Sequence, residues 1–196
     1  MFDLVSLVKT AGYFGLFTII FSECGLLVGF FLPGDSLLFT AGLLASQGYL
    51  NIYVLAPLFF AAAVLGDNVG YWIGKKTGPH IFNREESFFF RKENVKIAEK
   101  FFSEHGAKSI VLARFIPVIR TFAPVLAGVG NMDYKIFFRF NLLGGFLWGM
   151  CITLAGFFLG SAIPNIDKYL LPIIVAIILT PLYPFVPHVV RKARRR

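Results

Sequence analysis

Three stretches of the chain lack Asp, Glu, Lys and Arg over a length that can cross a lipid bilayer: residues 36–66, 140–166 and 169–190. A transmembrane helix needs about 20 consecutive, mostly apolar residues. The first stretch is longer than one helix requires, and the polar turn at residues 47–51 divides it. We therefore predict membrane-crossing helices at 52–74, 141–160 and 169–189.

The composition agrees with a chain that lies largely in lipid. Hydrophobic residues make up 57% of the 196 residues and charged residues 15%, whereas soluble domains have about 45–50% and about 25%. The two cysteines and three histidines show no metal-ligand spacing, and no Ser-His-Asp set or paired-carboxylate hydrolase set is present. We expect neither an enzyme nor a bound metal or cofactor, and a basic chain that meets a membrane rather than nucleic acid.

Two further hydrophobic segments, 14–46 and 109–130, are interrupted by charges and prolines. The first breaks at Pro33-Gly34, and each half of either segment has only about 10–14 residues, which is too short to cross a bilayer. Such halves favour re-entrant hairpins, which enter the membrane and return to the same side. For segment 14–46, a pair of ordinary spans joined by a loop at Pro33 is the alternative.

The distribution of positive charge predicts the topology. Of the 19 Lys and Arg residues, 15 lie in segment 75–108, in segment 131–139 or in the tail 190–196. Only Lys9 and Lys168 fall on the other predicted side, which puts the basic segments and the C-terminus in the cytoplasm. Residues 1–13 are predicted to form an interfacial amphipathic helix and segment 75–108 a cytoplasmic amphipathic segment.

The predicted fold is therefore an all-α polytopic membrane protein with an inverted repeat. Each repeat consists of a re-entrant hairpin followed by a transmembrane helix, first 14–46 with 52–74 and then 109–130 with 141–160. Helix 169–189 is additional. Interrupted segments at matching places in two inverted halves indicate a transporter with its binding site near the midplane.

Four charged residues are predicted to form that binding site: Glu23 and Asp35 on the first hairpin, Arg114 and Arg120 on the second. A charge at bilayer depth costs about 2.5–3.5 kcal/mol on insertion scales, so these residues should contact one another. The planar guanidinium suits a phosphate group, which it can bind through two parallel hydrogen bonds. The acids are candidates for proton exchange. Two buried salt bridges that merely join the hairpins are the structural alternative.

A second set of residues is predicted to support the site. Helix breaks near Pro33-Gly34 and Pro117 could direct free backbone N–H groups toward the same anion. Asp67 and Asn68 lie in a glycine-rich part of segment 52–74 that permits close helix contact. For Asp67, a role in packing and a direct role in transport remain open. Pro124 is the further interruption of the second hairpin.

These motifs, in this order, resemble the DedA family, the bacterial branch of the proteins that share the SNARE-associated or VTT domain. The resemblance covers about residues 14–160 and rests on the motifs Phe31–Asp35, Gly66–Gly74, Ala113–Pro124 and Gly144–Trp148. It implies a proton-dependent lipid transporter of the bacterial cytoplasmic membrane. The paired membrane acids of the family match Glu23 and Asp35, and its paired arginines match Arg114 and Arg120.

The resemblance implies a flippase for a phosphate-bearing lipid, with undecaprenyl phosphate recycling for cell-wall synthesis as the first choice. A phosphatidylethanolamine or general phospholipid flippase or scramblase is the alternative within transport. A membrane assembly factor without a substrate is the alternative outside it. The expected partners are the lipid and protons, and a homo-oligomer is left open.

Overall fold

The computed structural model describes residues 4–26, 34–81, 106 and 108–162, and all regular elements in this part of the chain are helices. Pro33, most of segment 75–108, the predicted helix 169–189 and the basic tail lie outside the described residues. The all-helical prediction is confirmed for the part of the chain that is described.

The first half contains three helices: α1 (Leu4–Gly25), α2 (Gly34–Ser46) and α3 (Ile52–Ile81). Helix α1 is broken at Gly12, whose φ of 58° lies in the left-handed region that glycine tolerates. Asn51 ends the turn between α2 and α3 and accepts a hydrogen bond from the Tyr53 amide at 2.9 Å, as an N-cap does. The Tyr13 hydroxyl accepts a bond from the Asn51 amide at 2.7 Å and ties α1 to this turn.

The second half contains α5 (Lys108–Ala113), α6 (Pro117–Val129), α7 (Tyr134–Gly145), the π-helical turn η2 (Phe146–Met150) and α8 (Cys151–Ala162). The last three form one continuous helix, which starts at Tyr134 rather than at residue 141. Asp133 fixes this start because its side chain accepts from the amides of Lys135 and Ile136. Lys135 and Arg139, which precede the span predicted at 141–160, therefore belong to the same helix.

Two helices in the described part are long and apolar enough to cross a bilayer. They run from Ile52 to Thr77, over 26 residues, and from Tyr134 to Ala162, over 29 residues. The predicted spans 52–74 and 141–160 lie within them. The interrupted segments appear as the pairs α1–α2 and α5–α6, each with a break between its helices.

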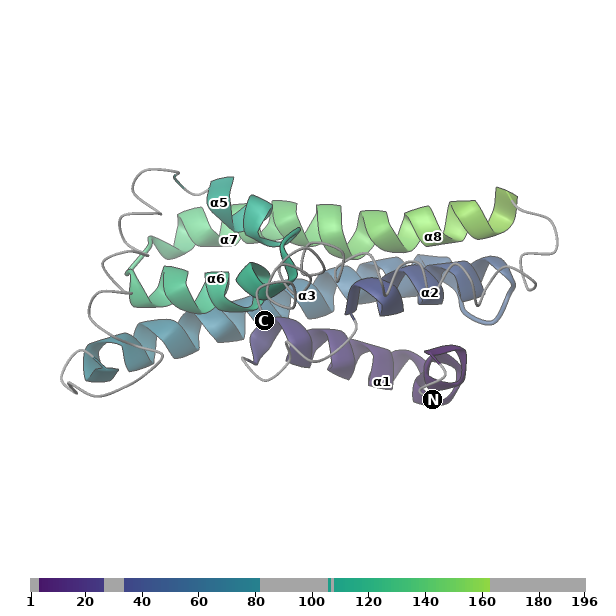
Figure 1. Cartoon of the computed structure of the whole chain (residues 1–196), viewed down its shortest axis with the longest axis horizontal. Helices are drawn as coiled ribbons and strands as arrows, with labels where there is room; N and C mark the ends of the chain where they lie inside the picture. The colour runs from purple at the N-terminus through teal and green to yellow at the C-terminus, as the bar shows by residue number, and fades with distance from the viewer. Residues whose placement is uncertain (1–3, 27–33, 82–105, 107, 163–196) are drawn as a thin grey trace, which may run out of the picture.

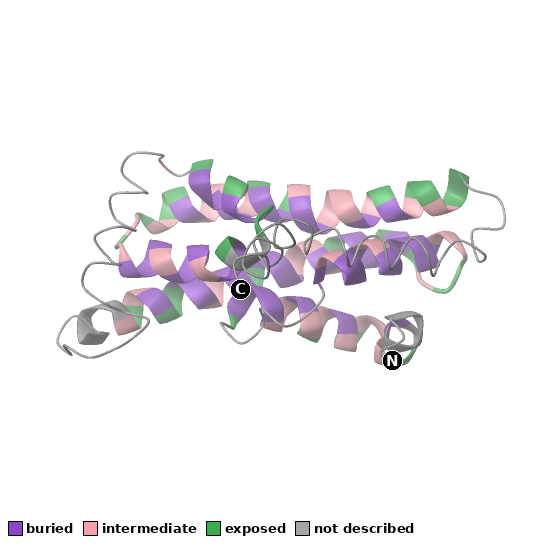
Figure 2. Ribbon diagram, in the orientation of Figure 1, coloured by how far each residue is buried: buried purple, intermediate pink, exposed green. Residues whose placement is uncertain are grey.

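The helices exchange partners between the two halves of the chain. Helix α2 packs mainly along α8, and α6 packs mainly along α3, while α1 lies on α3 and α5 on α7. Figure 1 shows an elongated bundle in which α2 and α6 begin near the middle of the long axis and extend toward opposite ends. Buried residues follow the inward faces of α2, α3 and α6 along most of this length (Figure 2).

Glycines allow two of these contacts to be very close. A Cβ at Gly42 in α2 would overlap the carbonyl oxygen of Thr153 in α8. A Cβ at Gly128 in α6 would overlap the carbonyl oxygen of Tyr71 in α3. Small residues at helix interfaces in membranes let backbones approach in this way.

Gly128→Ala should lower the stability of the protein in detergent by about 1–3 kcal/mol, because the added methyl group forces α6 away from α3. Gly70→Ala is the matched control in the same interface, since the atom nearest to its Cβ would be the Cβ of Pro124 at 3.3 Å. Thermal unfolding in detergent measures both. Equal midpoints for the two variants would contradict the close backbone contact at Gly128.

Candidate functional site

Arg120 on α6 is held by both acids of the first interrupted segment. Its Nη1 donates to Oδ1 of Asp35 at 2.6 Å, and its Nη2 donates to Oε1 of Glu23. Glu23 lies near the end of α1 and Asp35 at the start of α2, so the break between these helices brings the two carboxylates to one guanidinium. The structure thus places three of the four predicted charged residues together.

Gly34 permits this arrangement. A Cβ at Gly34 would overlap the carboxylate of Glu23, so only glycine lets the start of α2 approach this side chain. The side chains of Glu23 and Arg120 are 1% and 9% exposed, whereas that of Asp35 is 32% exposed. Asp35 is therefore the more accessible of the two acids.

Trp148 completes this group. Its Nε1 donates to Oδ1 of Asp35 at 2.6 Å, and its ring lies under the Arg120 guanidinium, with 4.7 Å between Cζ and the ring centroid. This distance is within the range of a cation–π interaction. We call Glu23, Asp35, Arg120 and Trp148 the Arg120 cluster.

Arg114 has other partners than expected. The sequence suggested contact with the acids of the first hairpin, but Nη2 of Arg114 donates to Oδ2 of Asp67 and to Oδ1 of Asn141. The reason is its position directly after α5, which packs on α7 and so brings Arg114 to the polar residues of α3 and α7. A Cβ at Gly144 would lie 2.7 Å from Cδ of Arg114, so this glycine provides the space for the side chain.

Asn141 links this second group to the backbone. Its Nδ2 donates to the carbonyl oxygen of Val64 at 3.1 Å, and its side chain is completely buried. We call Asp67, Arg114 and Asn141 the Arg114 cluster. In the described part of the chain, Nε of Arg114 has no hydrogen-bond partner, and neither has Nε of Arg120.

The two clusters are neighbours across the contact of α1 with α3. Cys24, next to Glu23, faces Gly66, next to Asp67, and a Cβ at Gly66 would lie 2.8 Å from that of Cys24. Together the clusters hold three carboxylates and two guanidinium groups. Fully ionised, they carry one net negative charge in a buried setting, and one proton makes the set neutral.

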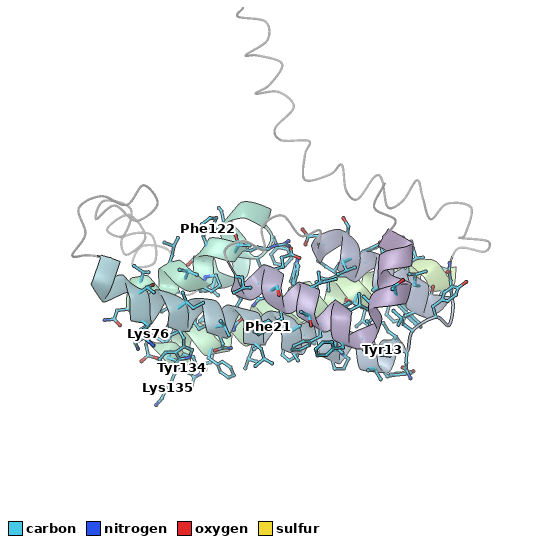
Figure 3. All side chains as sticks on the ribbon, turned by 90° about the horizontal axis from the view of Figure 1, so that it is seen from below. Tyr13, Phe21, Lys76, Phe122, Tyr134 and Lys135 are labelled. Carbon is cyan, nitrogen blue, oxygen red and sulfur yellow. The ribbon has the colours of Figure 1, made fainter. Side chains whose placement is uncertain are left out.

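The other predicted supporting residues lie around these clusters. Asn68 donates to the Val64 carbonyl at 2.7 Å and accepts from the Tyr134 hydroxyl at 2.9 Å. Pro117 begins α6, where its missing N–H costs nothing, and Pro124 lies inside α6 against α3. Tyr134 belongs to the end of the molecule that also presents Lys76 and Lys135, opposite the end with Tyr13 (Figure 3).

Sequence reasoning missed Asn141 and Trp148 as site residues. Asn141 was read only as the start of a span, although a buried amide in a transmembrane helix usually has a polar partner. Trp148 entered the sequence analysis only as the end of the Gly144–Trp148 motif, with no role in the site. No group of three or more His, Cys, Asp or Glu residues that could hold a metal ion occurs among the described residues.

Asp67→Ala should destabilise the protein by about 3–5 kcal/mol, because it leaves the buried Arg114 without its counter-ion. Asn68→Ala, one residue away, is the matched control, because the Asn68 side chain forms its hydrogen bonds with the Val64 carbonyl and the Tyr134 hydroxyl. Unfolding in detergent measures the stability of both variants. Equal stability of Asp67→Ala and Asn68→Ala would show that the ion pair between Asp67 and Arg114 contributes nothing.

The apolar pair Asp67→Leu with Arg114→Met should recover most of the stability lost in Asp67→Ala, because no buried charge then lacks a partner. This double variant distinguishes a role of Asp67 in helix packing from a direct role in transport. If it is stable and inactive, the Arg114 cluster acts in transport. If it is stable and fully active, the cluster is structural.

Two of the described helices have the length and the apolar composition of membrane-crossing helices, and ion pairs are buried between helices of the bundle. The VTT domain model matches residues 32–158 of the chain. The chain therefore belongs to the VTT-domain family of membrane proteins, the DedA family.

Its relatives are membrane proteins of bacteria. The chain is 48% identical over 166 residues to an uncharacterised membrane protein of Mycobacterium leprae, covering 85% of this chain and 74% of the relative. It is 44% identical over 181 residues to the protein DedA of Escherichia coli K12, covering 91% and 82%. It is 35% identical over 162 residues to the inner membrane protein YqjA of the same strain, covering 80% and 71%. No solved structure matches the chain.

Proposed function

We propose that the protein is a proton-coupled transporter that moves a phosphate-bearing lipid across the membrane. The observation that carries this proposal is the Arg120 guanidinium, which two carboxylates from another segment hold inside a membrane protein. A buried ion pair is a poor device for stability alone, because desolvation offsets the attraction between the charges. A function in binding would explain why the desolvated ion pair is present. The guanidinium could then exchange its carboxylate partners for a phosphate.

The charges of the two clusters suit such an exchange. When Glu23 and Asp35 are protonated, the Asp67 carboxylate and the two guanidinium groups leave one net positive charge, which attracts an anion. When both acids are ionised, the net charge is negative and a phosphate is repelled. Once the two acids no longer bind Arg120, its guanidinium can donate two parallel hydrogen bonds to two phosphate oxygens. Protons and the lipid phosphate therefore favour the same state.

The packing supports a transport cycle between two halves. In the proposal, α1–α2 and α5–α6 are re-entrant hairpins, and each hairpin with the following long helix forms one of two inverted repeats. The second arm of each hairpin packs on the long helix of the other repeat. Movement of one repeat against the other would then open the central charged site to one side at a time.

Undecaprenyl phosphate is the first choice of substrate, as the family resemblance suggests. Its phosphate is a monoester, with more free oxygens and more negative charge than the diester of a phospholipid. Arg120 and Arg114, which lie in neighbouring clusters, can use both properties. Phosphatidylethanolamine is the second candidate.

Mass spectrometry of lipids that purify with the protein in a maltoside detergent tests the proposal. An excess of polyprenyl phosphate over its abundance in the membrane, lost in Arg120→Ala, is the expected result. An excess of phosphatidylethanolamine would support the second candidate. A lipid profile equal to the bulk membrane, unchanged in Arg120→Ala, would favour an assembly factor without a substrate.

A further inference from the structure

One oxygen atom of the Arg120 cluster receives two donors. Oδ1 of Asp35 accepts from Nη1 of Arg120 and from Nε1 of Trp148, both at 2.6 Å. The two donors therefore converge on a single acceptor position, and the ring of Trp148 also carries the guanidinium on its face. Trp148 is 1% exposed, so its N–H has no access to water in this state.

This arrangement matters when Asp35 leaves. An indole nitrogen is a donor only, and a buried donor without an acceptor is costly. If a lipid phosphate replaces Asp35 as the partner of Arg120, one of its oxygens takes the position that Oδ1 occupied. That oxygen meets both the guanidinium and the indole N–H.

We propose that Trp148 is a phosphate-binding residue of this protein. Its indole N–H and Nη1 of Arg120 form one pair of donors, which Asp35 occupies without lipid and the lipid phosphate occupies during transport. The assignment rests on the proposed function, because it needs a phosphate ligand at Arg120. It adds a neutral side-chain donor to the four charged residues that the sequence predicted to form the binding site.

The backbone at Trp148 is a second observation that points to a site. Residues 146–150 form a π-helical turn inside an otherwise α-helical run from Tyr134 to Ala162. Such turns are rare and are found frequently at functional sites. The wider turn shifts Trp148 out of the register that a continuous α-helix would give it. Gly149 beside it allows close contact with α3, since a Cβ there would lie 3.1 Å from the Phe59 carbonyl oxygen.

The chain itself provides an optical test, because it contains only two tryptophans. Trp72 is 51% exposed on α3 and belongs to neither cluster. In Trp72→Phe, all tryptophan emission comes from Trp148. The purified protein in dodecyl maltoside is titrated with undecaprenyl phosphate and, as the matched control, with undecaprenol, which has the same tail and no phosphate.

The emission of Trp148 should change and saturate with undecaprenyl phosphate and stay constant with undecaprenol. A second titration with phosphatidylethanolamine shows whether a phosphate diester reaches the indole as well. Because Trp148 itself is unchanged in this variant, the readout does not depend on a substitution in the site.

Trp148→Phe gives the second measurement. Phenylalanine keeps a ring under Arg120 and removes the N–H from both the lipid-free and the lipid-bound state. The affinity for undecaprenyl phosphate should therefore fall, but by less than the roughly tenfold that loss of a hydrogen bond to a charged group causes. Wild-type affinity in Trp148→Phe together with constant Trp148 emission would overturn the assignment and leave the proposed function intact. Equal binding of undecaprenyl phosphate and undecaprenol by the wild-type protein would overturn both.

Discussion

Arg120→Lys should reduce lipid transport by about 100-fold, nearly as much as Arg120→Ala. The guanidinium bonds Asp35 through one terminal nitrogen and Glu23 through the other. A lysine ammonium is a compact point charge that cannot present a planar fork to two acceptors. Loss of one hydrogen bond between charged groups accounts for a factor of this size.

Arg114→Lys is the matched control. Both acceptors of Arg114, on Asp67 and Asn141, are bonded through the same terminal nitrogen, so one ammonium group can serve them. Arg114→Lys should therefore keep a larger part of transport than Arg120→Lys. Transport into proteoliposomes, with equal amounts of folded protein, measures the difference, and full activity of Arg120→Lys would refute phosphate recognition by its fork.

Charge-free length and broken hydrophobic segments were sufficient to predict the helices and the breaks between them. Residues 52–74 and 141–160 fall inside the two long helices, and the break at Gly34 separates α1 from α2. These features depend on local hydrophobicity and backbone chemistry. The start of the second long helix depended on the Asp133 cap, a signal that the uncharged window at 140–166 could not contain.

Pairing within the site was harder to predict, because it depends on how the helices rotate against one another. The cost of buried charge requires that acids and arginines meet, but it does not say which acid meets which arginine. Arg120 forms ion pairs with both acids of the first segment, whereas Arg114 forms an ion pair with Asp67. Trp148 lies 113 positions from Asp35 in the sequence, and its hydrogen bond arises only from the packing of α2 along α8 and the π-helical turn.

Glu23→Gln combined with Asp35→Asn should give a protein that binds lipid at least as tightly as wild type but transports it poorly. The amides imitate the protonated acids and release Arg120 for phosphate. They cannot ionise, so they cannot displace the phosphate at the end of the cycle. Glu23 and Asp35 each face the Arg120 guanidinium, and each also faces the other acid. The Arg114 cluster is not altered in this variant.

The pH dependence of binding provides the measurement. If lipid and protons favour the same state, wild-type affinity for undecaprenyl phosphate rises as the pH falls, because linkage is reciprocal. The double variant should keep one affinity from pH about 8.5 to about 5.5, because its two amides do not titrate. Asp133→Asn, which changes a helix cap outside both clusters, should retain the wild-type profile. A double variant with the wild-type profile and full transport would mean that Glu23 and Asp35 only join the helices and that proton coupling resides in other groups.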